Sequence, residues 1–384
     1  MGVLILLDLS AAFDTVDHVI LLSRLKQTFG VDGTAHRWFR SYLLGRTQYV
    51  RRGATRSTIT RLLCGVPQGS VLGPILFILY TIDLIPLIER HNLSPHLYAD
   101  DTQVNGSCRP CDVDTFALLA EECTHEVASW MRSNRLQLNS AKTEVLWCAT
   151  NRRRHQLPTS ALSVDGVMVD PVTSVRDLGI FIDADLVMRT HVQRTVSRCF
   201  AVLRQLRQIR HLVPSATLQT LVVTLVLSRL DYGNGVLIGL PAYLLRRLQS
   251  VLNASARLIF HLRRSDHITD ALVSLHWLRA PERIQFKIAV LTYKVLHGTA
   301  PRYLGPLVRV ADLPGRRGLR SANTNRLVVP SYNLSTIGNR TFDVASAQTW
   351  NSLPEHVTSS PTLSTFRLRL KTHLFRLSYP DYVL

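Results

Sequence analysis

The chain has 384 residues and is strongly basic, because 45 Lys and Arg outnumber 27 Asp and Glu and give a net charge of +18. A hydrophobic content of 46% excludes a disordered protein and predicts two or three folded domains. The positive charge favours a polyanionic partner such as nucleic acid, and 40 of the 45 basic residues are arginines, which suit phosphate contacts. A genomic bias toward arginine codons would produce the same composition.

The first predicted element is a buried strand that ends in an acidic residue. The apolar run predicts this strand over residues 3–8, and Asp8 closes it. The apolar spacing over residues 16–29 predicts a helix whose N-cap is Asp14 or Asp17. The elements expected next are a helix over 34–44 and a hairpin formed by 46–52 and 57–64.

Proline and glycine exclude regular structure from residues 65–74 and let the backbone approach a ligand closely. Ser70 can cap the apolar helix that follows. The segment 71–88 is almost long enough to span a membrane, but Asp83 and Pro86 are unfavourable in lipid. We therefore expect one long buried helix at 71–88 and no membrane partner.

Two adjacent carboxylates, Asp100 and Asp101, follow a short apolar run at a point where the chain must turn. Isolated pairs of this kind are usually solvated turn residues or helix caps. Like charges held close together are unfavourable unless a cation neutralises them. If this strand lies beside the strand of Asp8, the three acids converge, and two Mg²⁺ ions held by carboxylates are the usual apparatus of phosphoryl transfer.

The next part of the chain alternates strands and helices, which predicts an antiparallel sheet backed by helices in an α+β fold. Further on, residues 186–297 are expected to be mainly helical, and residues 299–339 irregular because they are rich in Pro, Gly, Asn and Ser. The intervening elements expected are a helix over 114–134, strands over 136–138 and 144–149, and a hairpin with an Asp-Gly turn over 161–167.

Six cysteines in so long a chain, with no apolar signal segment and cleavage site, predict free thiols and a reducing intracellular setting, either nucleus or cytoplasm. Cys108 and Cys111, with Cys123 and His125 downstream, offer a zinc site as an alternative. The spacing of the second pair is poor for zinc, so we prefer a loop with incidental thiols.

A helix beginning near residue 186 has one apolar and one basic face. The apolar positions are Val192, Val196, Cys199, Leu203 and Leu206, and the basic ones are Arg194, Arg198 and Arg204. A solvated surface is the ordinary interpretation of such a basic face. The alternative is that this face binds the phosphate backbones of nucleic acid strands.

Three motifs resemble motifs A, B and C of reverse transcriptases in the correct order: Asp8, Pro67-Gln68-Gly69 and Tyr98-Ala99-Asp100-Asp101. Residues 7–14 and 138–144 look like the non-LTR (LINE-type) retrotransposon branch, and residues 175–180 resemble motif E, the primer grip. The resemblance implies an RNA-directed DNA polymerase. It also implies three domains: a palm with motifs A to E at 1–183, a helical thumb at 184–298, and a C-terminal segment of unknown role at 299–384.

The resemblance also assigns roles at the metal site. Asp8 and Asp100 would bind two Mg²⁺ ions directly, Asp101 would complete the acidic cluster, and the backbone carbonyl of Leu9 would supply a further oxygen. The substrates implied are an RNA template, a DNA primer and deoxynucleoside triphosphates. Nothing in the sequence indicates the oligomeric state.

Other matched positions would contact the incoming nucleotide. Phe13 matches the bulky gate that excludes a ribose 2′-hydroxyl, and Pro67, Gln68 and Gly69 match the loop that packs on the nucleotide and template. Lys142 matches the motif D lysine that protonates or neutralises the departing pyrophosphate. Taken alone, Phe13 would be a core aromatic and Lys142 a surface lysine.

The sequence also departs from the family pattern. Met1 stands only seven residues before Asp8, so the fingers that normally precede motif A are expected to be largely missing, and the chain alone is expected to have weak or no activity. An RNA-dependent RNA polymerase is disfavoured by Phe13 and by the Pro-Gln-Gly loop. A non-catalytic nucleic-acid-binding remnant of a retrotransposon is the other alternative.

Overall fold

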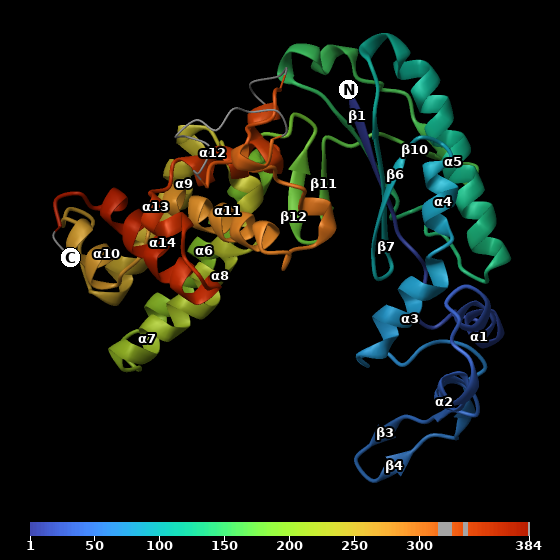
Figure 1. The fold of residues 1–384 in the computed structure, drawn as a ribbon. Helices are drawn as coiled ribbons and strands as arrows, with labels where there is room; N and C mark the ends of the chain where they lie inside the picture. Colours follow the sequence, from blue (N-terminus) through green and yellow to red (C-terminus); the bar gives the residue numbers. More distant parts are fainter. Residues whose placement is uncertain (314–324, 333–336, 383–384) are drawn as a thin grey trace. The chain divides into compact units, whose positions relative to one another are not determined.

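The computed structural model describes residues 1–313, 325–332 and 337–382. The chain divides into two compact units (Figure 1). The first contains residues 1–179 and 183–186, and the second contains residues 180–182 and 187–384. Each unit has its own hydrophobic core.

The first unit is built on a four-stranded antiparallel sheet with the strand order β6-β7-β1-β8. β1 (Gly2–Leu7) is central and pairs with both β7 (Asp101–Ser107) and β8 (Glu144–Cys148), while β6 (Ser94–Tyr98) lies at the edge. Buried and half-buried residues alternate along β1, as expected for a strand with one face against the core. The predicted first strand, the hairpin at Asp100-Asp101 and the strand at 144–149 are confirmed.

Four helices supply most of the first core, namely α1 (His18–Gln27), α3 (Leu72–Thr81), α4 (Leu84–Glu89) and α5 (Val113–Ser133). Asp17 caps α1, because its carboxylate accepts hydrogen bonds from the backbone N–H groups of Val19 and Ile20. The predicted helices at 16–29 and 114–134 are therefore confirmed, and the mixed helix-and-strand class with them.

The prediction of one long helix over 71–88 was wrong. The segment forms two helices, α3 and α4, which are separated at Ile82 and Asp83. Pro86 explains the break, because it has no N–H to donate to the carbonyl of Ile82 in a continuous helix. In α4 the proline instead lies in the first turn, where an N–H would lack a helical partner anyway.

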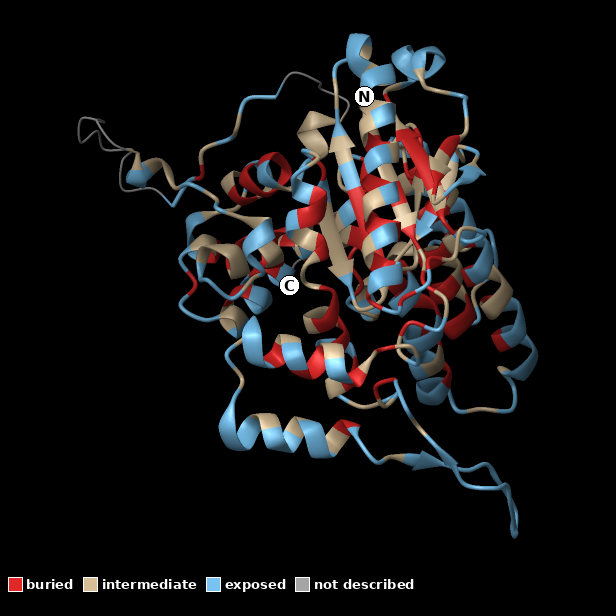
Figure 2. Cartoon of the chain, turned by 90° about the vertical axis from the view of Figure 1, so that its right-hand side faces the viewer, coloured by how far each residue is buried: buried red, intermediate tan, exposed pale blue. Residues whose placement is uncertain are grey.

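A helix and a narrow ribbon lie between α1 and α3 in sequence. α2 (Gly33–Leu43) is followed by two short strand pairs, and all eight residues of these strands are exposed (Figure 2). The strands are β2 (Thr47–Gln48) paired with β5 (Thr60–Arg61), and β3 (Arg51–Arg52) paired with β4 (Thr55–Arg56). The hairpin predicted over 46–64 is present, with shorter strands than expected.

The remaining strands of this part follow local signals in the sequence. β9 (Leu162–Val164) and β10 (Val167–Val169) form the predicted hairpin, and its turn residues Asp165 and Gly166 have φ values of 52° and 76°. The predicted strand at 136–138 was wrong, because only the isolated bridge between Leu9 and Leu138 forms. The strand cannot continue because the chain turns at Asn139, whose carbonyl accepts the N–H groups of Lys142 and Thr143. The last strands are β11 (Ser174–Asp177), in the first unit, and β12 (Ile180–Asp183), of which residues 180–182 belong to the second unit.

The second unit is helical. α6 (Arg189–Ile209) buries the predicted apolar positions, from Val192 to Leu206, and exposes Arg194, Arg198 and Arg204. The α- and π-helices that follow among the described residues are α7 (Ser215–Val222), the π-helix η3 (Val223–Leu227), α8 (Ser228–Asp231), α9 (Ala242–Ile259), α10 (Thr269–Ser274), α11 (Ala280–Leu296), α12 (Phe342–Asn351), α13 (Glu355–Thr358) and α14 (Leu363–Ser378). Short 3₁₀ turns are η1 (Pro110–Asp112), η2 (Asn151–Gln156), η4 (Asn234–Leu237), η5 (Arg302–Leu304), η6 (Val310–Asp312) and η8 (Gly338–Arg340).

The last helices share a core with those that precede residue 298. The ring of Phe366 on α14 stacks on Tyr293 of α11 at 4.6 Å and on Trp350 of α12 at 5.7 Å between centroids. Part of the irregular region expected at 299–339 lies outside the described residues, and the described part contains short 3₁₀ turns and one isolated antiparallel bridge between Arg309 and Leu327. Across the described ranges, no helix combines the length and apolarity needed to cross a membrane.

Candidate active site

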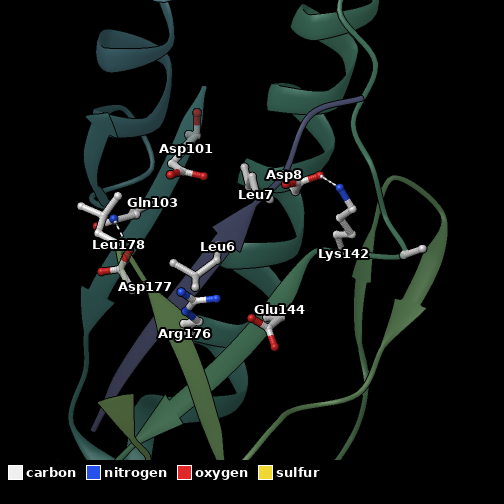
Figure 3. Close-up of a pocket in the computed structure, with 12 residues that line it drawn as sticks. Leu6, Leu7, Asp8, Asp101, Gln103, Lys142, Glu144, Arg176, Asp177 and Leu178 are labelled. Carbon is white, nitrogen blue, oxygen red and sulfur yellow. Dashed lines mark hydrogen bonds and ion pairs between the residues drawn. The ribbon is translucent and has the colours of Figure 1, made fainter. Parts of the chain in front are cut away.

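Strand pairing brings the acids of the first and third motifs together. Leu7 of β1 lies opposite Thr102 of β7, so continuing the antiparallel register places Asp8 opposite Asp101. Both carboxylates line a cavity of about 400 Å³ at the end of the sheet (Figure 3). Lys142 and Glu144 contribute to the same cavity.

Asp100 lies at the tip of the β6-β7 hairpin and does not line this first cavity. Tyr98 pairs with Asp101, so Ala99 and Asp100 form a two-residue turn, and Ala99 has a φ of 54°. Positive φ strains a residue with a side chain, and this strain is typical of functional turns. The sequence predicts that three acids converge. In the structure Asp8 and Asp101 share one cavity, and Asp100 lines the adjacent one.

The charges of the three acids are coupled. Partial desolvation raises the pKa of Asp101 above its ordinary value, and the negative charges of Asp100 and Asp8 raise it further. A divalent cation would relieve this repulsion. The structure therefore supports the like-charge cluster that the sequence indicates.

Asp8 is the best-placed cation ligand. Its Oδ2 atom is buried and accepts no hydrogen bond from the described part of the chain, and the ammonium of Lys142 lies 3.3 Å from it. A hard, buried carboxylate oxygen that already faces a positive charge has the donor chemistry that Mg²⁺ prefers. Within the described ranges, no three His, Cys, Asp or Glu side chains stand together as a ready metal site.

The adjacent cavity gathers the predicted nucleotide-contacting residues. It has a volume of about 470 Å³, and its lining includes Leu9, Phe13, Pro67, Gln68, Gly69 and Asp100. Leu9 and Leu138 lie opposite each other, and two backbone hydrogen bonds flank the pair. Ser10 N–H donates to the carbonyl of Gln137, and Asn139 N–H donates to the carbonyl of Asp8. In such a pair the carbonyl of Leu9 points away from Leu138, toward the side of β1 on which β7 lies.

Hydrogen bonds hold the Pro-Gln-Gly loop against the loop that follows Asp8. The N–H of Val66 donates to the carbonyl of Phe13 at 2.8 Å, and Gln68 Nε2 donates to Asp14 Oδ1 at 2.9 Å. Gly65 has a φ of 91°, and a Cβ there would lie 3.0 Å from the carbonyl oxygen of Asp14. The glycine is therefore required for close approach between two stretches of backbone.

Phe13 is half-buried between the core and the cavity. Its ring lies 5.2 Å from the ring of Phe77 on α3, measured between centroids, at an interplanar angle of 48°. This contact is the one expected of a core aromatic. Phe13 also lines the second cavity, so the structure permits the gate role as well.

Among the residues of the first cavity that were not predicted from the sequence are Gln103, Glu144, Arg176 and Asp177. Gln103 Nε2 donates a hydrogen bond of 2.6 Å to Asp177 Oδ1 and so joins β7 to β11 (Figure 3). Burial raises the pKa of Asp177, and the charge of Asp101 raises it further. Asp177 falls in the stretch that resembles motif E, whereas an isolated glutamine in a strand gives no signal.

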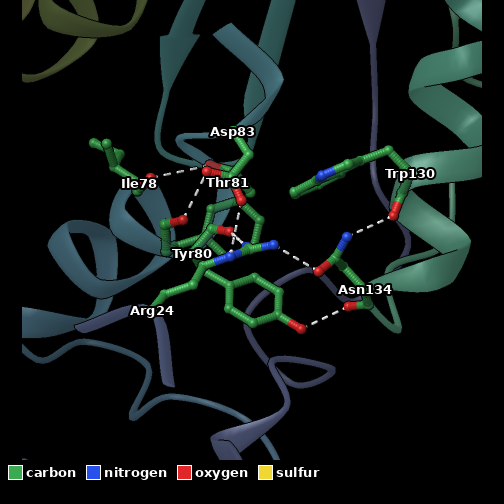
Figure 4. A network of polar contacts seen from close by, with 8 residues as sticks. Arg24, Ile78, Tyr80, Thr81, Asp83, Trp130 and Asn134 are labelled. Carbon is green, nitrogen blue, oxygen red and sulfur yellow. Dashed lines mark hydrogen bonds and ion pairs between the residues drawn. The ribbon is translucent and has the colours of Figure 1, made fainter. Parts of the chain in front are cut away.

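A polar network centred on Arg24 joins the helices of the first unit (Figure 4). Its guanidinium donates to the carbonyl of Tyr80 and, at 2.7 Å, to Asn134 Oδ1, and it pairs with Asp83 at 3.1 Å. It also lies over the rings of Tyr80 and Trp130, at 5.1 and 5.0 Å from their centroids. Asn134 ends α5, and the chain then returns to Leu138, which lies beside Leu9. Because the network holds Asn134 in place, it supports the segment that carries Lys142.

The three remaining predicted residues, Arg194, Arg198 and Arg204, belong to the second unit and line neither cavity. They are exposed along α6, and the guanidinium of Arg194 lies 4.6 Å from the centre of the Phe181 ring. Their proposed contact with nucleic acid stays a prediction.

Acidic side chains at neighbouring strand ends, beside two cavities, form the kind of site that enzymes of phosphoryl transfer use. Residues 2–181 match the family model described as reverse transcriptase (RNA-dependent DNA polymerase). This part of the chain is therefore similar to reverse transcriptases.

Two curated relatives from Drosophila melanogaster support the LINE-type, non-LTR branch of that family. The probable RNA-directed DNA polymerase from transposon BS is 30% identical over 220 residues, which cover 56% of this chain and 24% of that protein. The corresponding protein from transposon X-element is 33% identical over 195 residues, which cover 48% of this chain and 20% of that protein. The chain thus spans a quarter or less of the length of these relatives.

Among solved structures, telomerase from Candida albicans in complex with a fragment of telomeric RNA covers 74% of this chain and 47% of its own length. The identity is 12% and the TM-score is 0.35, and we draw nothing from so low a similarity.

Replacing Lys142 by glutamine is expected to raise the affinity of the chain for Mg²⁺ about two- to fivefold, because an ion pair whose lysine is exposed to solvent contributes up to ~1 kcal/mol. The substitution removes the ammonium that competes with the metal for Asp8 Oδ2. Isothermal titration calorimetry with MgCl₂ measures the change, and Lys142→Arg, which keeps the charge, is the matched control. Equal or weaker Mg²⁺ binding by Lys142→Gln would show that the ion pair does not compete with the metal.

Replacing Arg24 by leucine is expected to lower the free energy of unfolding by roughly 2–3 kcal/mol, because it leaves polar groups of three helices without their partner. Lys26→Leu, on the same helix, is the control, since the Lys26–Asp32 pair is exposed to solvent. Urea denaturation followed by circular dichroism compares the two variants. If the two variants unfold with equal free energy, the Arg24 network does not stabilise the fold.

Proposed function

We propose that the first unit is a polymerase palm that catalyses RNA-directed DNA synthesis by nucleotidyl transfer. The observation that carries the proposal is the antiparallel register that sets Asp8 opposite Asp101 at the mouth of a cavity, with Asp100 at the adjoining turn. The match of residues 2–181 to the reverse transcriptase family model supports it.

Asp8 and Asp100 would hold two Mg²⁺ ions, with Asp101 and the carbonyl of Leu9 as further oxygen donors. When bound, such ions lower the pKa of the primer 3′-hydroxyl and neutralise charge on the triphosphate. Asp8 presents a buried oxygen for this purpose, and the carbonyl of Leu9 faces away from its bridge partner Leu138. Lys142 would then leave Asp8 and turn to the departing pyrophosphate, within reach of its long flexible stem.

The second cavity would hold the incoming deoxynucleoside triphosphate. Its volume of about 470 Å³ lies within the range of ordinary ligand sites. Pro67, Gln68 and Gly69 would pack on the nucleotide and the template, and Phe13 would close the space that a 2′-hydroxyl needs. Because Gln68 is bonded to Asp14, the loop would keep its position when the nucleotide leaves.

Two basic surfaces support an RNA template and a DNA primer as partners. In the second unit, which we propose to act as the thumb, Arg194, Arg198 and Arg204 would contact the strand backbones. In the first unit, residues 33–64 contain seven arginines and no Asp or Glu, and Trp38 and Tyr49 are 52% and 46% exposed. Exposed aromatic rings beside arginines suit stacking on unpaired bases.

The ribbon in this segment carries an unfavourable contact of its own. Arg51 lies directly opposite Arg56 in the β3-β4 pair, and like charges at opposed positions destabilise a ribbon. A phosphate backbone would offset this repulsion, which is a second reason to place nucleic acid on residues 33–64.

Asp8→Asn is expected to reduce Mg²⁺-dependent primer extension on an RNA template roughly a thousandfold, since metal binding supplies several kcal/mol of transition-state stabilisation. Asp112→Asn, at an exposed position in η1, is the control that should extend like the wild type. Single-nucleotide extension of a labelled primer, followed on gels, measures the rates. The weak activity expected of the chain alone stays a prediction that the wild-type reaction tests.

Two outcomes would argue against this function. Equal extension by Asp8→Asn and the wild type would remove Asp8 from the reaction. Salt-sensitive binding of primer and template, with no extension by any variant, would favour the non-catalytic remnant.

A further inference from the structure

The second unit contains a cavity that the proposed function does not use. It has a volume of about 520 Å³ and is lined by residues of α8, η4, α11, α14, the π-helix η3 and the segment 275–278. Two of the five lysines of the chain, Lys287 and Lys371, line it, although arginines outnumber lysines by 40 to 5. The pairing of scarce lysines at one cavity indicates a site for an anion.

A buried amide in this cavity lacks a hydrogen-bond donor. Asn234 is 4% exposed, its Nδ2 lies 3.4 Å from Asp231 Oδ1, and its Oδ1 accepts no hydrogen bond within the described residues. The amide cannot flip, because the carboxylate of Asp231 only accepts hydrogen bonds and would repel Oδ1. Asn234 Oδ1 therefore needs a donor from a ligand or from water.

The charge around this amide is positive. Arg283 pairs with both carboxylate oxygens of Asp231, and this pair is close to neutral. The stem of Lys287 runs along η4, since a Cβ on Gly235 would lie 3.6 Å from its Cγ. With Lys371 from α14, the cavity keeps two uncompensated ammonium groups among its lining residues.

Part of the cavity wall is apolar. It includes Trp277 and Phe286 together with Val223 and Leu227 from the π-helix. π-helical turns are rare and occur frequently at functional sites. A ligand that fits must therefore combine an anionic group, a hydrogen-bond donor and a flat apolar surface.

We propose that this cavity binds a nucleotide, with its phosphate at Lys287 and Lys371, a base or sugar donor at Asn234 Oδ1, and the base against the apolar wall. The nucleotide is either free or part of a single strand, and both share this chemistry. An acidic peptide would satisfy the lysines but would leave the apolar wall unused. The proposal concerns the second unit alone and does not depend on catalysis in the first.

The test measures binding of AMP, CMP, GMP, UMP, inorganic phosphate and an eight-nucleotide DNA to the full chain by isothermal titration calorimetry. EDTA is present, so that metal-dependent binding at the first unit does not contribute. The double variant Lys287→Gln/Lys371→Gln is expected to weaken nucleotide binding at least tenfold. Lys294→Gln, on the same helix but outside the cavity lining, is the matched control and should bind like the wild type.

A second variant separates the amide from the lysines. Asn234→Ser should weaken nucleotide binding and leave phosphate binding unchanged. Binding of mononucleotides would identify a site for free nucleotides, and binding of the oligonucleotide alone, with a salt slope lower by about two in the double lysine variant, would identify a strand contact.

Three results would overturn the proposal. They are equal nucleotide binding by the double lysine variant and Lys294→Gln, phosphate binding as tight as that of the nucleotides, and no binding of any probe at millimolar concentration. Both lysines are exposed, so the double variant should fold, and thermal unfolding checks this.

Discussion

The pairing of β1 with β7 is the constraint on which the candidate site depends. The two strands are far apart in sequence, and only their antiparallel hydrogen bonds bring Asp8 and Asp101 to the same end of the sheet. The pairing is held by buried apolar residues of β1, such as Ile5, which contact the helical layer. The acids themselves oppose it, because their charges repel and raise the pKa of Asp101. Hydrophobic packing thus holds in place a charge cluster that is unfavourable by itself.

Much of the first unit could be predicted because its signals are local. An apolar run ending in Asp8, a capping Asp17 and the Asp165-Gly166 turn each determine their own structure within a few residues. Features that depend on tertiary packing were predicted wrongly or not at all. The break between α3 and α4 depends on where Pro86 falls in a turn, and the bond between Gln103 and Asp177 depends on packing that no spacing in the sequence reveals.

The positions of the acids show the same limit. The sequence indicates that Asp8, Asp100 and Asp101 act together, but adjacent residues at a hairpin turn point in different directions. Asp101 consequently joins the cavity of Lys142, and Asp100 joins that of Phe13 and Gln68. The sequence also gives no signal for the unsatisfied amide of Asn234. Only the fold places this residue beside Asp231 and leaves its Oδ1 atom without a hydrogen-bond donor among the described residues.

The alternation of side chains along β1 has a consequence for how such a gene can change. Apolar residues at Val3, Ile5 and Leu7 can be exchanged for others of similar size with modest loss. Insertion or deletion of one codon, however, would slip the strand by a residue and turn every side chain to the other face, so that Asp8 would leave its cavity. Copies of this sequence should therefore drift by substitution within β1 while its length stays fixed.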